Sequence, residues 1–207
     1  MIEIPPLPDG DDVPSQATVA DALVRLLPDS AQEAGRLVLE SAILPHALRA
    51  LADFERPRAM VEEVYEELAA ELVHSDDPMS TLHNLAIATE LDALSDAALA
   101  LAIARYARDH PSAERTARHW LPDGQARLLE LSDDEIAGEA ARRLDALRKL
   151  EARARADEAI WEQSRVQVVH TRLTFQSARS GSFEAAAGPL GDFLREVGEA
   201  PDNLDVH

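Results

Sequence analysis

The chain contains no cysteine, which excludes disulfides, zinc–thiolate sites and thiol nucleophiles. Aromatic residues make up only 4% of its 207 residues, and it has only eight glycines. With few aromatic and β-branched side chains, β structure is poorly supported. No apolar run approaches the ~18 residues that a membrane span needs, and the N-terminus lacks the basic start and apolar stretch of a signal peptide. We therefore expect a cytoplasmic protein.

Lysine is almost absent. Of the 20 basic residues, 19 are arginine and the exception is Lys149. They face 39 acidic residues, which gives a net charge of −19. A charge of this sign repels nucleic acids and anionic membranes, so we expect neither as a partner. A GC-rich genome or a high-salt cytoplasm produces the same composition. The functional alternative is an acidic surface that binds another protein, a basic one in particular.

The charge is unevenly distributed along the chain. The first 100 residues carry five basic and 20 acidic side chains, whereas residues 101–165 carry 12 and 13. Such asymmetry indicates either that an acidic helix pairs with an arginine-rich one or that two faces have different partners. A solvated acidic face is the more common explanation. A homo-oligomer, in which the acidic half of one copy meets the basic residues of another, is also possible.

Alanine and leucine are abundant, with 37 and 28 residues, and both are strong helix formers. Apolar residues recur at helical spacing between capping signals and prolines. The sequence therefore predicts an all-α, multi-helix bundle of about seven to nine helices, in a single domain over residues 15–198. Residues 1–14 hold four prolines and no helical period, which predicts a flexible proline-rich arm, and residues 199–207 are expected to form a loose polar tail.

Several helix starts are readable from the sequence. Ser15 precedes the first apolar stripe, and Pro57 suits the first turn of a helix that runs to about His74. Ser30 and Ser132 each begin a capping box, and Ser95 is expected to cap another helix. We expect the helix after Ser132 to be the longest, an amphipathic helix near 132–165.

Residues 166–176 allow two interpretations. Their β-branched residues suit a strand, but Trp161, Val168 and Phe175 recur every seven residues and continue a helix. Because an isolated strand in a helical chain has nothing to pair with, we favour the helix.

Two charged helix faces are candidate partner-binding sites. The first is acidic and comprises Glu62, Glu63, Glu66, Glu67 and Glu71. The second is basic and comprises Arg142, Arg143, Arg148 and Arg153, interleaved with acidic residues. Opposite charges three or four residues apart on a helix attract each other, so the basic group is either a self-neutralised face or a docking strip for an acidic partner.

Chemical motifs are scarce. Glu71 and His74 form one Glu-x-x-His pair, whereas a di-iron bundle site needs two such pairs and two further glutamates. The sequence has no glycine-rich phosphate loop and no Gly-x-Ser-x-Gly elbow. We expect no cofactor, no catalytic residue and no metal site.

The sequence thus favours a non-enzymatic, acidic, helical protein-interaction module, such as an assembly factor, a chaperone-like adaptor or a structural subunit. An acidic inhibitor or immunity protein that covers a basic site is one alternative, and a helical di-metal enzyme is another. A large exposed apolar patch favours the first interpretation, and clustered exposed acids without apolar neighbours favour the inhibitor.

Overall fold

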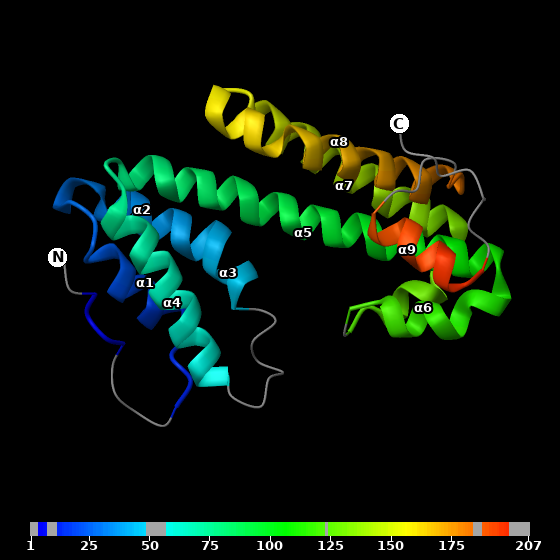
Figure 1. The fold of residues 1–207 in the computed structure, drawn as a ribbon, viewed down its shortest axis with the longest axis horizontal. Coiled ribbons are helices and arrows are strands. Elements are labelled where there is room, and N and C mark those ends of the chain that lie inside the picture. Colours follow the sequence, from blue (N-terminus) through cyan, green and yellow to red (C-terminus); the bar gives the residue numbers. More distant parts are fainter. Residues whose placement is uncertain (1–3, 8–11, 49–56, 123, 184–187, 199–207) are drawn as a thin grey trace. The chain divides into compact units, whose positions relative to one another are not determined.

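The structure is a computed structural model that describes residues 4–7, 12–48, 57–122, 124–183 and 188–198. All regular secondary structure within these residues is helical, as Figure 1 shows, which confirms the predicted all-α bundle. By its internal contacts the chain divides into two compact units, residues 1–90 and 91–207. Helix α5 (Pro78–Asp109) contributes its first part to one unit and its remainder to the other.

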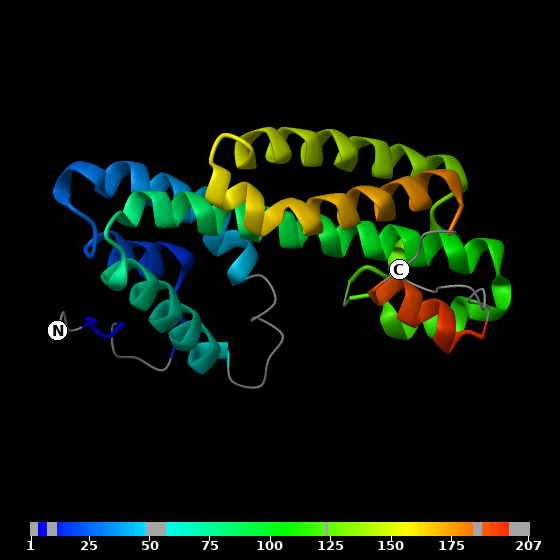
Figure 2. The same cartoon turned by 45° about the horizontal axis from the view of Figure 1, so that its top comes forward.

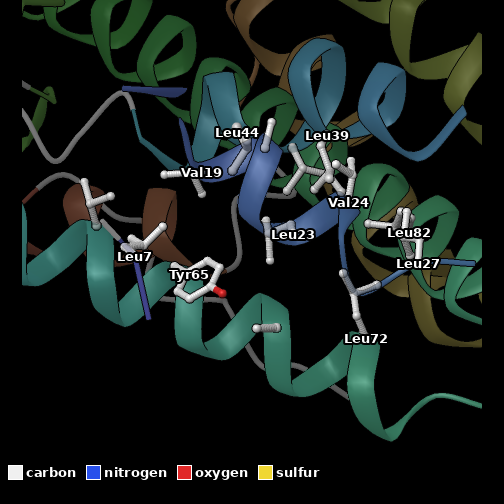
Figure 3. Packing of buried hydrophobic residues seen from close by; sticks show 14 of the residues in the cluster. Leu7, Val19, Leu23, Val24, Leu27, Leu39, Leu44, Tyr65, Leu72 and Leu82 are labelled. Carbon is white, nitrogen blue, oxygen red and sulfur yellow. The ribbon is translucent and has the colours of Figure 1, made fainter. Parts of the chain in front are cut away.

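The first unit begins with α1 (Gln16–Val24), whose N-cap is Ser15, as predicted. It continues with α2 (Gln32–Val38), the π-helix η2 (Leu39–Ile43), α3 (Leu44–Ala47) and α4 (Pro57–His74). Their apolar residues form one core, shown in Figure 3, with contributions from α1, η2, α3, α4 and the start of α5. Its fully buried large side chains are Leu23, Leu39, Ile43, Leu44, Tyr65, Leu72 and Leu82.

Part of the segment that we expect to be an arm contacts this core. Leu7 is buried beside Tyr65, as Figure 3 shows, and the Tyr65 hydroxyl donates to the Pro5 carbonyl at 2.5 Å. Burial raises the pKa of Tyr65, against the opposing effect of the Arg25 charge. Residues 4–7 are therefore anchored to α4.

A proline interrupts the regular α-helix in this unit, and one capping prediction is wrong. The π-helix η2 immediately precedes Pro45, and helical residues continue through it as α3. Since proline lacks an N–H and its ring clashes with the carbonyl four residues earlier, the wider π turn accommodates it. Ser30 does not cap α2, because Asp29–Ala31 already forms a 3₁₀ turn and Ala31 occupies the N-cap position without a side-chain bond.

The second unit holds the end of α5, then α6 (Glu114–Trp120), α7 (Asp133–Ala154), α8 (Glu158–Ser180) and α9 (Pro189–Glu196). The Ser132 capping box opens α7, as predicted. Ser95 does not start a helix: α5 runs through it, and its hydroxyl instead bonds the Thr171 hydroxyl at 2.6 Å.

The predicted helix near 132–165 is wrong beyond Ala154. There the chain turns, and α8 packs side by side with α7, as Figure 2 shows. The turn is fixed by Asp157, whose carboxylate accepts from the backbone N–H groups of Ala159 and Ile160 at 2.9 and 3.2 Å. These bonds satisfy free donors at the start of α8. The helical interpretation of residues 166–176 is confirmed, since they lie within α8.

Candidate partner-binding surface

The predicted acidic face lies on α4. Val61, Tyr65, Ala69 and Leu72 turn into the core of the first unit, so the opposite side of the helix faces solvent. Glu63, Glu66, Glu67 and Glu71 are exposed there, and Glu62 at the edge accepts a hydrogen bond from Arg58 Nε at 2.8 Å. Among the described residues of α4, no large apolar side chain is exposed beside them. The structure therefore places the five glutamates on the solvent side of α4, with no large exposed apolar side chain among them.

The predicted basic residues lie on α7 but do not form one strip. At about 100° per residue, Arg142 and Arg153 share a side of the helix, whereas Arg143 and Arg148 point about 140° apart. Arg142 pairs with Glu139 at 3.0 Å, and Lys149 pairs with Asp145 at the same distance. Arg143 and Arg148 are exposed and make no ion pair within the described part of the chain. Of the predicted residues, Arg142 is thus neutralised within the helix, whereas Arg143 and Arg148 keep exposed charges on different sides of it.

Sequence reasoning missed the outward face of α8. Val166, Val169 and Leu173 are 71%, 47% and 41% exposed. Their spacing of three and four residues places them in one line along the helix. We call these three residues the α8 stripe. It contains three of the five exposed large apolar residues among those described, and the other two, Val13 and Leu37, lie in the first unit.

The buried side of α8 contains several polar residues, whereas large apolar residues of the same helix are exposed. Ser164, Thr171, Thr174 and Ser177 are buried. Ser164 and Thr174 donate to the carbonyls four residues earlier at 2.7 and 3.0 Å, and Thr171 bonds Ser95 of α5. A buried hydroxyl destabilises the folded state only when it lacks a hydrogen-bond partner, so these bonded hydroxyls can be buried without a large loss of stability.

Contacts on two sides fix the rotation of α8. On the side of α5, Gln167 donates to the Asp92 carboxylate at 2.6 Å. On the side of α7, Arg172 forms an ion pair with Glu151. Burial opposes the charge of Glu151, but the hydrogen bonds from Arg172 and Arg155 outweigh it and lower the pKa of this carboxyl. The stripe is therefore held away from both neighbouring helices.

An arginine row borders the α8 stripe. Arg165, Arg172 and Arg179 are spaced by seven residues, so they lie along one edge of it. Arg165 pairs with Glu162 at 3.2 Å, Arg172 is engaged by Glu151, and Arg179 is exposed without an ion pair among the described residues. The opposite edge carries Gln163 and His170, neither of them acidic, and the next position of the repeat is the buried Ser177.

Other candidate sites carry less chemistry. His74 Nδ1 lies 2.7 Å from the Ala70 carbonyl, so the ring closes the end of α4. No group of three or more potential metal ligands occurs within the described residues. A hollow of about 420 Å³ near the ends of α1 and α4 is lined by Arg25, Leu72, Ser75 and Asp76, among others. The Ser75 hydroxyl there is already bonded to Thr81 at 2.7 Å.

Comparison of the chain with protein-family models, with curated proteins and with solved structures found no match. Within the described segments, no helix is both long and apolar enough to cross a membrane.

Proposed function

We propose that this protein is a non-enzymatic interaction module that binds another protein through the α8 stripe. One observation carries the proposal: three large apolar side chains stand in line on the solvent side of a helix whose buried side is partly polar. Single exposed apolar residues are ordinary, whereas contiguous apolar patches with a polar rim mark interaction sites. The cytoplasmic location and the absence of a catalytic role are part of this proposal.

The size of the stripe sets the strength of binding that it can support. Full burial of a valine or leucine side chain contributes about 1.5–3 kcal/mol. Since the three side chains are already about half covered, a partner gains roughly 3 kcal/mol from them. Association costs at least ~4 kcal/mol in lost freedom of motion. The partner must therefore gain further from the polar rim, and we expect a transient complex.

The test is an affinity purification from native lysate that compares the wild type with Val166→Ser/Val169→Ser/Leu173→Ser. The matched control is Leu37→Ser, which removes an isolated apolar residue that is 69% exposed in the first unit. We expect one protein that the wild type captures at low and moderate salt, that is lost with the triple variant and that is retained with the control. Equal recovery by all three proteins refutes the proposal.

The acidic surface of α4 supports a second candidate function, an inhibitor that covers a basic site of its partner. Exposed glutamates without apolar neighbours are its expected signature. Such binding is fast and salt-sensitive because it depends on charge. We expect Glu63→Gln/Glu66→Gln/Glu67→Gln to abolish capture of a basic protein at low salt if this function holds, and to change nothing if the face is merely solvated.

A further inference from the structure

We infer that the occupant of the α8 stripe is an amphipathic helix of a different protein, with acidic residues along one border of its apolar seam. This inference rests on the function proposed above and specifies its partner. It is carried by the spacing of the stripe and by the charges of its borders.

The spacing of the stripe favours a helical occupant. Extended in both directions, the line runs through positions 162, 166, 169, 173, 176 and 180, with alternating intervals of four and three. This is the seam along which two helices pack side by side. Apolar residues occupy its centre, and Glu162, Gln176 and Ser180 occupy its ends. A partner helix of about three turns covers the apolar centre.

The borders of the seam define the charge of the occupant. In the seven-residue repeat, Arg165, Arg172 and Arg179 occupy the same border position, immediately before a seam residue. Residues at such positions pair across a helix–helix interface and select the partner. An occupant with glutamate or aspartate facing this row is attracted most strongly at Arg179, which has no ion pair among the described residues. The attraction is weaker at Arg165 and Arg172, which already pair with Glu162 and Glu151. An occupant with lysine or arginine there is repelled.

A second copy of this chain does not fit these borders. In an antiparallel pair of α8 helices, the arginine row of one copy faces the arginine row of the other. In a parallel pair, the row faces Gln163, His170 and Ser177, which offer no carboxylate. The acidic helix α4 of a second copy cannot serve either, because its apolar residues are buried in the core of the first unit.

The test uses two designed, dye-labelled helical peptides with the same leucine and valine seam. One carries glutamate at the border positions, and the other carries lysine. Binding to the full chain is followed by fluorescence anisotropy at low and moderate salt. Because exposed ion pairs are weak, we expect the glutamate peptide to bind about three- to thirtyfold more tightly, and this preference to shrink with salt.

Two variants identify the surface. Arg165→Glu/Arg179→Glu leaves the Arg172–Glu151 ion pair intact and should reverse the preference. Its matched control is Arg115→Glu/Arg127→Glu, which makes the same change of net charge at exposed positions elsewhere in the second unit and should leave the preference unchanged. The serine triple variant of the stripe should bind neither peptide. Circular dichroism verifies that each variant keeps its helicity.

The outcomes separate this inference from the function on which it rests. Equal binding of the two peptides, tighter binding of the lysine peptide, or binding of neither overturns the inferred occupant. If capture from lysate still depends on the stripe in that case, the interaction function stands and only the inferred partner fails. Self-association in sedimentation experiments that is lost in the serine triple variant would identify a second copy as the occupant and would also overturn the inference.

Discussion

Adjacent valines on α8 provide a direct test of how this helix is rotated, on which the stripe depends. Val168 is fully buried, with 0% exposure, and Val169 is 47% exposed. Replacing either by alanine removes two methyl groups, which contribute about 0.8 kcal/mol each when buried. At Val168 the change also leaves a cavity, so the loss there is about 2–3 kcal/mol. At Val169, which is about half exposed, the loss of buried apolar surface costs about half as much, and the better helix propensity of alanine offsets most of that cost.

We therefore expect Val168→Ala to lower the free energy of unfolding by about 2 kcal/mol and Val169→Ala to change it by less than about 0.5 kcal/mol. The assay is urea unfolding followed by tryptophan fluorescence. Both tryptophans, Trp120 and Trp161, lie in the second unit, so the signal reports the unit that contains α8. With a slope of about 2 kcal/mol per molar urea, the midpoint of Val168→Ala should fall by about 1 M.

The same experiment can refute the description of α8. Equal losses for the two variants, or a larger loss at Val169, would mean that the helix is rotated and that the stripe faces the core. In that event the proposed docking surface would lose its basis. Far-ultraviolet circular dichroism, which reports both units, shows whether the first unit is affected as well.

Three further predictions concern the stability of each unit. Tyr65→Phe removes the hydrogen bond to Pro5 and should destabilise the first unit by about 1 kcal/mol, measured by urea unfolding followed by circular dichroism; an unchanged midpoint would mean that residues 4–7 are not anchored. The hydrogen bonds from Ser132 lower the pKa of Glu135 in the folded protein. They therefore stabilise the fold above the pKa that Glu135 has in the unfolded chain, and this stabilisation is lost as the pH falls through the lower pKa of the folded state. On the acid side, the free energy of unfolding should fall less steeply with pH in Glu135→Gln than in the wild type, and identical slopes would contradict this. Gly181 ends α8 at φ +70°, so Gly181→Ala should cost about 1–2 kcal/mol in tryptophan-detected unfolding, and a neutral effect would mean that the cap differs.

The starts of helices were readable from the sequence where a local signal decides them. Ser15, Pro57 and Ser132 begin helices as predicted, because capping depends on neighbouring residues. The prediction for Ser95 is wrong because its hydroxyl bonds Thr171 of α8, and a contact so distant in the sequence cannot be predicted from neighbouring residues. The turn after Ala154 contains neither glycine nor proline, and only Asp157 signals it.

The α8 stripe was not predictable, because two seven-residue patterns overlap in that helix. Trp161, Val168 and Phe175 form one, and Val166 and Leu173 belong to the other. Periodicity identifies both faces as apolar but cannot say which one neighbouring helices cover. Here Val168 and Phe175 are buried, and Val166 is left in solvent. On α7, helical geometry alone already separates Arg143 from Arg148, so their division between two sides of the helix is readable from the sequence.

Photo-crosslinking can show whether a partner protein contacts the outward face of α8. A benzophenone amino acid is placed at position 169 in one sample and at position 37, the isolated exposed leucine of the first unit, in another. We expect one dominant covalent adduct from position 169 on irradiation in cells, reduced by Arg165→Glu/Arg179→Glu and absent from position 37. No adduct from position 169, or the same adducts from both positions, would contradict it.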